Sequence, residues 1–284
     1  QYGDTTYKHT PNGDLLTKTS EGQTTTYEYD ALGNLIAVAL GDGTEIEYLV
    51  DGDNRRIGKK VNGALEQGFL YLDQVNPIAE LDGAGNLVSL FVYATRATLP
   101  AYMVKDGTTY RIVSDHLGSP RLVVNAETGE IVQRMDYDDF GTVIQDTNPG
   151  FQPLGFAGGI YDRQTKLVRF GARDYDPLTG RWTSRDPLLF EGGQTNLYTY
   201  VDNDPVNQTD PLGTGWIDDM LDRFKRIAPD AAEEARKAAE EAAKQRRPPP
   251  PPKPKPRLPN PVPKDFRGTP IRCLYPWILI DPSL

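Results

Sequence analysis

The strongest constraint on the fold is a turn motif that recurs about every twenty residues in the first half of the chain. Most copies place an aromatic or apolar residue before an Asp, and a turn that usually contains Gly follows. The spacing is 21 residues from Asp30 to Asp51, 22 from Asp51 to Asp73, and 23 from Asp115 to Asp138. A fixed period of this size indicates a repeat architecture.

The segments between these turns alternate polar residues with apolar or aromatic ones. Residues 24–29 read TTTYEY and residues 44–49 read TEIEYL. Such a two-residue period is typical of a half-buried antiparallel strand. Because one hairpin cannot bury its apolar face alone, stacked hairpins should share one continuous sheet. We therefore predict a mostly β protein with a hairpin sheet over residues 1–145, in which Asp and Gly shape the turns and Tyr packs one hairpin on the next.

A second block, within residues 146–214, is dense in turn residues. Four Asp-Pro steps lie between residues 173 and 214, at Asp176, Asp186, Asp204 and Asp210. Proline fixes φ, and the Asp side chain can accept hydrogen bonds from nearby backbone. We expect a compact, cross-braced unit that plugs the sheet.

Composition narrows the class of protein further. The 284 residues can bury a sizeable core, and 27 Gly with 15 Tyr favours strands over helices. The net charge of −9 argues against a nucleic-acid surface. The single cysteine, Cys273, excludes an intramolecular disulfide, and no apolar run approaches the 18 residues of a membrane helix. The chain begins in mid-pattern at Gln1, so we expect it to be a fragment of a longer protein.

The composition changes completely after Gly213. Residues 215–247 have helical spacing followed by an Ala/Glu/Lys-rich stretch, which predicts a helical segment. Residues 248–268 are rich in proline, typical of a polyproline II linker, although a ligand for an SH3-type domain is an alternative. Residues 269–284 form an apolar tail that we expect to be buried against the body or in a partner.

The block from residue 173 to residue 214 resembles the core signature of the Rhs/YD-repeat family, which includes bacterial polymorphic toxins and the C subunits of Tc toxins. The resemblance rests on RDYDPLTGRWTSRDP, GGQTNLYTYVDNDP and DPLGT. Leu189 stands where the family has Gly, and Thr214 stands where it has Leu. The resemblance implies that the hairpin sheet is part of a spiralling hollow shell closed by the core block.

Three residues of this block could carry chemistry. Two carboxyl groups that share a site cannot both ionise cheaply, so one can act as a general base and the other as a general acid. A guanidinium can hold the ionised partner and stabilise oxyanion charge. The resemblance implies that Asp186 and Asp210 form such a pair with Arg173 as stabiliser, and that they cleave their own chain at Thr214-Gly215. From residue types alone, turn formers and a buried ion pair that braces the plug are the more common role, because Asp-Pro turns are frequent.

Other sites have little support. No turn fits the EF-hand pattern of a calcium loop, and nothing gathers a nucleophile, base and acid around His116. We predict no metal and no cofactor. Three functions remain open: a self-cleaving encapsulation module, a non-catalytic structural or adhesive scaffold, and an effector activity within residues 215–284.

The resemblance also implies partners and a location. The first partners would be the chain's own upstream shell and its own C-terminal segment. Further partners would be a component of a secretion system or toxin complex, and an immunity protein. The protein would be secreted or delivered to a target cell and be of bacterial origin.

Overall fold

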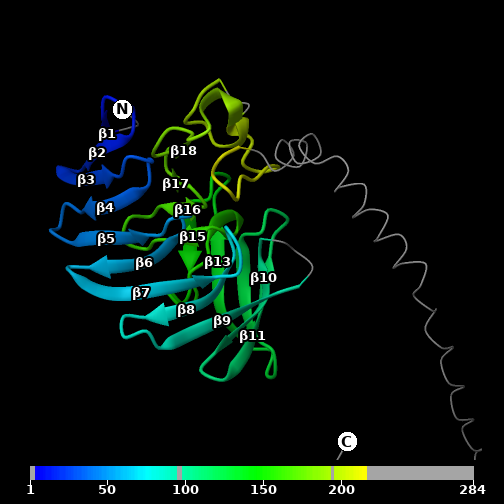
Figure 1. Ribbon diagram of the computed structural model, residues 1–284. Coiled ribbons are helices and arrows are strands. Elements are labelled where there is room, and N and C mark those ends of the chain that lie inside the picture. Colours follow the sequence, from blue (N-terminus) through cyan, green and yellow to red (C-terminus); the bar gives the residue numbers. More distant parts are fainter. Residues whose placement is uncertain (1–3, 95–97, 193–194, 216–284) are drawn as a thin grey trace, which may run out of the picture. The chain divides into compact units, whose positions relative to one another are not determined.

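The computed structural model describes residues 4–94, 98–192 and 195–215, all of which belong to one compact unit, Gln1–Ala232. Residues up to Asp146 form an antiparallel 14-stranded sheet whose strands follow one another in chain order (Figure 1). This arrangement confirms the predicted mostly β hairpin sheet. Its strands are β1 Thr6–His9, β2 Leu15–Ser20, β3 Gln23–Tyr29, β4 Leu35–Ala39, β5 Glu45–Val50, β6 Arg56–Val61, β7 Ala64–Tyr71, β8 Pro77–Asp82, β9 Leu87–Tyr93, β10 Pro100–Lys105, β11 Thr108–Ser114, β12 Pro120–Asn125, β13 Ile131–Tyr137 and β14 Val143–Asp146.

The recurring Asp residues shape the turns between hairpins as the sequence predicts. Oδ1 of Asp30 accepts hydrogen bonds from the amides of Leu32 and Asn34, both at 2.9 Å. Asp82 and Asp138 make the same pair of bonds to the second and fourth residues after them. The carboxylate thus holds the loop closed while the next strand begins.

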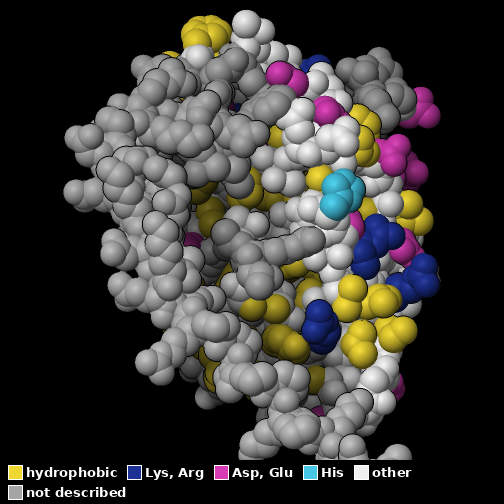
Figure 2. All heavy atoms as spheres, turned by 90° about the vertical axis from the view of Figure 1, so that its right-hand side faces the viewer, with side chains coloured by type: hydrophobic (Ala, Val, Ile, Leu, Met, Phe, Trp, Pro, Cys, Tyr) yellow, Lys and Arg dark blue, Asp and Glu magenta, His cyan; other side chains and the backbone are white. Residues whose placement is uncertain are grey.

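The two faces of the sheet differ. Figure 2 shows one side of the molecule, on which hydrophobic side chains lie among Lys and Arg side chains. Exposed apolar residues occur on several strands, among them Val92, Val113 and Ile131. On the same strands Phe91 and Ile112 point the other way and are buried. The sheet therefore has a buried inner face and a mixed outer face.

A second, 4-stranded antiparallel sheet forms the plug. Its core is aromatic, and the rings of Tyr175 and Tyr200 have centroids 4.4 Å apart. The elements of the plug are β15 Ile160–Tyr161, β16 Val168–Phe170, β17 Arg173–Asp176, β18 Arg181–Trp182 and the 3-10 turns η1 Phe156–Gly158, η2 Leu189–Gly192 and η3 Val201–Asn203.

Buried ion pairs attach the plug to the inner face of the large sheet. Asp174 accepts from Arg56 of β6 and from Arg169 of β16, each at 2.9 Å. Lys59 of β6 contacts Asp162 at 2.7 Å. Since buried charges are tolerated only when they are paired, these contacts fix where the plug can sit.

The predicted helical segment at 215–247, the linker at 248–268 and the apolar tail at 269–284 lie outside the described residues, apart from Gly215. In the part of the chain that the structure describes, we find no helix of the length and apolarity that crossing a membrane requires.

Candidate functional site

The three predicted site residues meet in the plug. Nη2 of Arg173 lies 2.9 Å from Oδ2 of Asp186 and 3.2 Å from Oδ2 of Asp210. Their exposed fractions are 1%, 3% and 2%, so all three are enclosed by protein. One guanidinium nitrogen therefore bridges two carboxyl groups that are 24 residues apart in the chain.

Asp186 is held by an Asp-Pro turn. Its backbone oxygen accepts from the amide of Leu189 at 3.0 Å, and its Oδ1 accepts from the amide of Leu188 at 2.8 Å. The carbonyl oxygen of Leu197 accepts from the amide of Asp186 at 3.0 Å and from Nη1 of Arg173 at 3.2 Å. The chain around Leu197 thus positions both partners at once.

Asp210 reaches the peptide bond that the sequence predicts to be cut. Its backbone oxygen accepts from the amide of Gly213 at 3.2 Å, which closes a turn. Its Oδ1 accepts from the amide of Thr214 at 3.2 Å, and its Oδ2 accepts from the amide of Gly215 at 2.9 Å. The nitrogen of Gly215 is the nitrogen of the Thr214-Gly215 bond, so the carboxyl group lies beside the leaving atom of that bond.

Two glycines allow the backbones around Arg173 and Asp210 to approach closely. Gly171 has φ +38, and a Cβ there would lie 2.3 Å from the carbonyl oxygen of Leu212. Gly213 has φ +64, and its carbonyl oxygen accepts from Nε of Arg173. Any side chain at either position would push the two segments apart.

Burial sets the charge state of the site. It raises the pKa of Asp210 from 3.8 to about 6, even though Arg173 and the amides of Gly215 and Thr214 favour the carboxylate. The nearby Asp186 carboxyl raises the pKa of Asp210 further. Burial lowers the pKa of Arg173, whereas the two carboxyl groups counteract this. Asp210 can therefore hold or release a proton near neutral pH.

Two contributors to the site escape sequence reasoning. The guanidinium carbon of Arg173 lies 4.1 Å from the ring centroid of Trp182, a cation–π contact that fixes its plane. Leu197 acts only through its carbonyl oxygen. The RW pair in the core signature is the signal for Trp182, but a backbone acceptor leaves no mark in the sequence.

His116 and the turn aspartates, which had little support from the sequence as functional sites, bond to backbone groups. Nε2 of His116 is 2.7 Å from the carbonyl oxygen of Val206, so the ring bonds to backbone. The turn aspartates, such as Asp30, bond to amides of their own loops. Among described residues, no three His, Cys, Asp or Glu side chains lie together as metal ligands would.

Comparison with known proteins gives the family. The family model described as Teneurin YD-shell matches residues 1–206. Teneurin-4 of Mus musculus is 33% identical over 222 residues, which cover 74% of this chain and 8% of teneurin-4. The toxin protein Tse5 of Pseudomonas aeruginosa is 33% identical over 199 residues, or 66% of this chain and 15% of Tse5.

Solved structures give a looser likeness. A chain of the TcdB2-TccC3 crystal structure without the hypervariable C-terminal region is 19% identical, with a TM-score of 0.43, and the match covers 74% of this chain and 10% of that one. This chain thus spans a small part of the proteins that it matches. By the extent of the family-model match, the chain belongs to the YD-repeat shell family that the teneurin YD-shell model describes.

Proposed function

We propose that this chain is the C-terminal part of a YD-repeat shell that cleaves its own backbone between Thr214 and Gly215 and so releases the segment that follows. One observation carries the proposal: Oδ2 of Asp210 lies 2.9 Å from the nitrogen of Gly215 and shares Nη2 of Arg173 with Asp186. A carboxyl pair is thereby assembled next to one particular peptide bond.

The geometry supports an aspartyl hydrolysis in cis. In this scheme Asp186, held by Arg173, is the base that takes a proton from a water attacking the carbonyl carbon of Thr214. As that carbon becomes tetrahedral, the nitrogen of Gly215 becomes basic and takes the proton of Asp210. The C–N bond then breaks, leaving a carboxylic acid on Thr214 and an amine on Gly215, while Asp186 keeps the proton taken from the water. One water is consumed, and one turnover is possible.

Arg173 has two roles in this scheme. Its Nη2 favours an ionised carboxyl on one partner, and its Nε holds the carbonyl oxygen of Gly213, adjacent to the bond that breaks. The carbonyl it holds is one residue before the reacting carbonyl of Thr214, so we propose that its charge also stabilises oxyanion charge as it develops. Arg173, Asp186 and Asp210 are each more than nine-tenths buried, so water screens these interactions little.

The relatives suggest what is released. Tse5 is named a toxin protein, and we propose that the segment after Thr214 is a toxin or effector that the shell encloses until cleavage. Under this proposal the protein is secreted or delivered, its first partner is its own upstream shell, and a toxin complex and an immunity protein are further partners. An effector activity in residues 215–284 by themselves is the weaker alternative.

A structural scaffold is the second candidate, because a buried and fully paired Arg173 also suits a brace. It joins Asp186, Asp210 and two backbone carbonyls. The match to a teneurin shell favours this alternative as much as the first. In a scaffold the two carboxyl groups would hold the plug together and the backbone would stay intact.

Single Asp→Asn variants separate the two candidates. Asp186→Asn and Asp210→Asn should leave the chain uncut, whereas Asp204→Asn should not affect cleavage. Asp204 is the matched control because it also precedes a proline in this block, yet its carboxyl oxygens accept from the side-chain amides of Asn207 and Gln208. Denaturing electrophoresis measures the cut fraction. Normal processing of Asp210→Asn would rule out the proposed role of Asp210.

A further inference from the structure

A small cavity of about 30 Å³ lies where the large sheet meets the plug. The strands and turns of the sheet contribute Arg55, Arg56 and Tyr71 to its lining, and the plug contributes residues 157–160 and 169–171. The described lining holds three arginines and no Asp or Glu. None of the three residues of the proposed cleavage site lines the cavity, so it is a separate place in the fold.

Two of these arginines are buried and keep an unused donor. Arg56 and Arg169 are each 3% exposed, and each donates to Asp174 at 2.9 Å. Nη2 of Arg169 also donates to Oδ1 of Asn34 at 2.8 Å and to the carbonyl oxygen of Asn54 at 2.9 Å. The Nε atoms of both arginines have no hydrogen-bond partner among the described residues. Since a buried N–H without an acceptor is unfavourable, both are suited to an acceptor from outside the protein.

The buried charges beside the cavity do not balance. Arg56 and Arg169 share one carboxylate, that of Asp174, which leaves one positive charge in excess among these three groups. Burial opposes the charge of Arg56, but Asp174 outweighs it with smaller help from Asp162, and the pKa of Arg56 is raised. Burial lowers the pKa of Arg169; Asp174 opposes this, whereas the charge of Arg56 lowers it further. Arg169 is therefore the group that is short of negative charge.

The third arginine of the lining is compensated at the surface. Arg55 pairs with Asp51 at 2.8 Å and with Asp53 at 3.3 Å, both in its own turn. The side chain of Asp53 is 67% exposed, so solvent screens this group much more than the buried pair. The excess positive charge thus lies on the inner side of the site, at Arg56 and Arg169.

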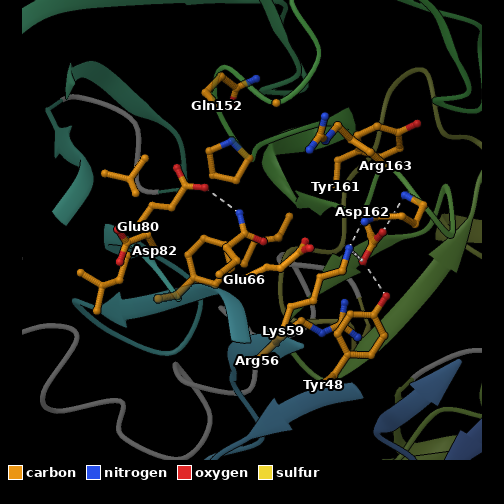
Figure 3. A pocket seen from close by; sticks show the side chains of 18 of the residues that line it. Tyr48, Arg56, Lys59, Glu66, Glu80, Asp82, Gln152, Tyr161, Asp162 and Arg163 are labelled. Carbon is orange, nitrogen blue, oxygen red and sulfur yellow. Dashed lines mark hydrogen bonds and ion pairs between the residues drawn. The ribbon is translucent and has the colours of Figure 1, made fainter. Parts of the chain in front are cut away.

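Arg56 also lines a larger cavity of about 230 Å³, which Figure 3 shows from close by. Its guanidinium carbon lies there 3.5 Å from the ring centroid of Tyr48. The lining of that cavity includes Glu66, Glu80 and Asp82, all labelled in Figure 3. Because carboxylates repel an anion, the larger cavity is unsuited to one, whereas the small cavity has arginines and no acid in its described lining.

The size of the small cavity selects the ligand. A space of this kind needs about 10–15 Å³ to admit one water-sized particle. About 30 Å³ therefore admits a monatomic anion and excludes a phosphate or a carboxylate-bearing molecule. A water molecule would satisfy a donor but would leave the excess charge in place.

We propose that this cavity binds a chloride ion between Nε of Arg169 and Nε of Arg56. The ion accepts a charge-assisted hydrogen bond from each guanidinium and offsets the charge that Asp174 leaves uncompensated. Arg56 belongs to β6 of the large sheet and Arg169 to β16 of the plug. The bound chloride therefore adds to the contacts that hold the plug on the sheet, and the stability of the fold depends on chloride concentration.

Urea denaturation in sodium chloride, with sodium gluconate keeping the ionic strength constant, tests the proposal. The full chain carries Asp210→Asn, so that it stays whole whether or not the parent cleaves itself. Above the dissociation constant, each tenfold rise in chloride should raise the ratio of folded to unfolded protein about tenfold. Gluconate is too large for the cavity, so this response reports chloride and not ionic strength.

Two matched variants locate the response. Arg169→Gln removes the excess charge and should reduce the response to less than about twofold per tenfold rise in chloride. Arg134→Gln removes an exposed guanidinium, whose side chain is 58% exposed, and should respond as the unsubstituted chain does. No response of the unsubstituted chain, or an equal response of Arg169→Gln, overturns the proposal.

A second measurement needs no variant at Arg169, in case that substitution prevents folding. Crystals of the full chain grown in sodium bromide are measured at the bromine absorption edge, where bromide scatters anomalously. One anomalous peak should lie between the Nε atoms of Arg56 and Arg169. Density without an anomalous signal at that place would show that the cavity takes water, and the proposal would be wrong.

Discussion

Gly213→Ala tests the close backbone approach that places Asp210 beside Arg173. At φ +64 a Cβ would lie 2.4 Å from the carbonyl oxygen of Phe170 and 2.9 Å from the amide nitrogen of Arg173. Both atoms belong to backbone, so the two segments must separate. The left-handed conformation costs an alanine about 1–2 kcal/mol, and the overpacking adds about 1–3 kcal/mol. We expect the free energy of unfolding to fall by about 2–5 kcal/mol in total.

The assay is urea denaturation in an Asp210→Asn background, which under the proposed function keeps the chain in one piece. Gly43→Ala is the matched control, because Gly43 has φ +90 and nothing lies within 4 Å of an added Cβ. It should lose only about 1–2 kcal/mol from the backbone conformation. In the parent background, Gly213→Ala should also slow cleavage, since the 3.2 Å contact between Arg173 and Asp210 lengthens. An equal loss of stability in both variants, with cleavage unaffected, would refute the reasoning.

Three other predictions concern charge and strain. Asp174→Asn leaves two buried guanidinium groups without their shared carboxylate, so the free energy of unfolding in urea should fall by about 3–5 kcal/mol. Asp136→Asn, at a more exposed ion pair, should lower it by less than about 1 kcal/mol, and similar losses for the two variants would contradict this. The pKa of Asp210 is raised to about 6, and in the proposed scheme this residue donates the proton. The cleavage rate after refolding should therefore fall as the pH rises through about 6. A rate that still increases at pH 8 would exclude Asp210 as the general acid. Leu189 has φ +52 and is 44% exposed. Leu189→Gly should relieve about 1–2 kcal/mol of backbone strain and cost about 0.5–1 kcal/mol of chain entropy, so the free energy of unfolding should stay the same or rise slightly. A fall of more than about 1 kcal/mol would show that the leucine side chain packs against the protein.

Much of the fold follows from local rules that the sequence displays. Asp30 and its counterparts close their own loops within four residues, and such short-range bonds can be anticipated from residue type and spacing. The strands between them alternate and stack in chain order, so the topology needs no long-range information. The motif also identified Arg173, Asp186 and Asp210, which the structure brings together.

Contacts between segments distant in the chain could not be anticipated. The approach of Gly171 to Leu212 and the stacking of Trp182 on Arg173 depend on how the plug folds back on itself. The deep burial that raises the pKa of Asp210 likewise could not be anticipated.

Leu189 shows how a departure from a motif can be explained physically. The family has Gly at this position, and the structure gives Leu189 a φ of +52, where glycine is favoured. The turn keeps its shape because Leu188 and Leu189 still donate to Asp186. The substitution therefore stores strain next to the site without removing the carboxyl group from it.

The most direct test of the central claim is the intact mass of the purified protein under denaturing conditions, with Asp210→Asn as the uncut reference. Denaturation matters because the two pieces could remain associated after cleavage. We predict that the parent separates into residues 1–214 and 215–284, with one water added across the Thr214-Gly215 bond, whereas Asp210→Asn gives a single full-length mass. A single full-length mass for both proteins would contradict self-cleavage and make Arg173, Asp186 and Asp210 the brace of a structural shell.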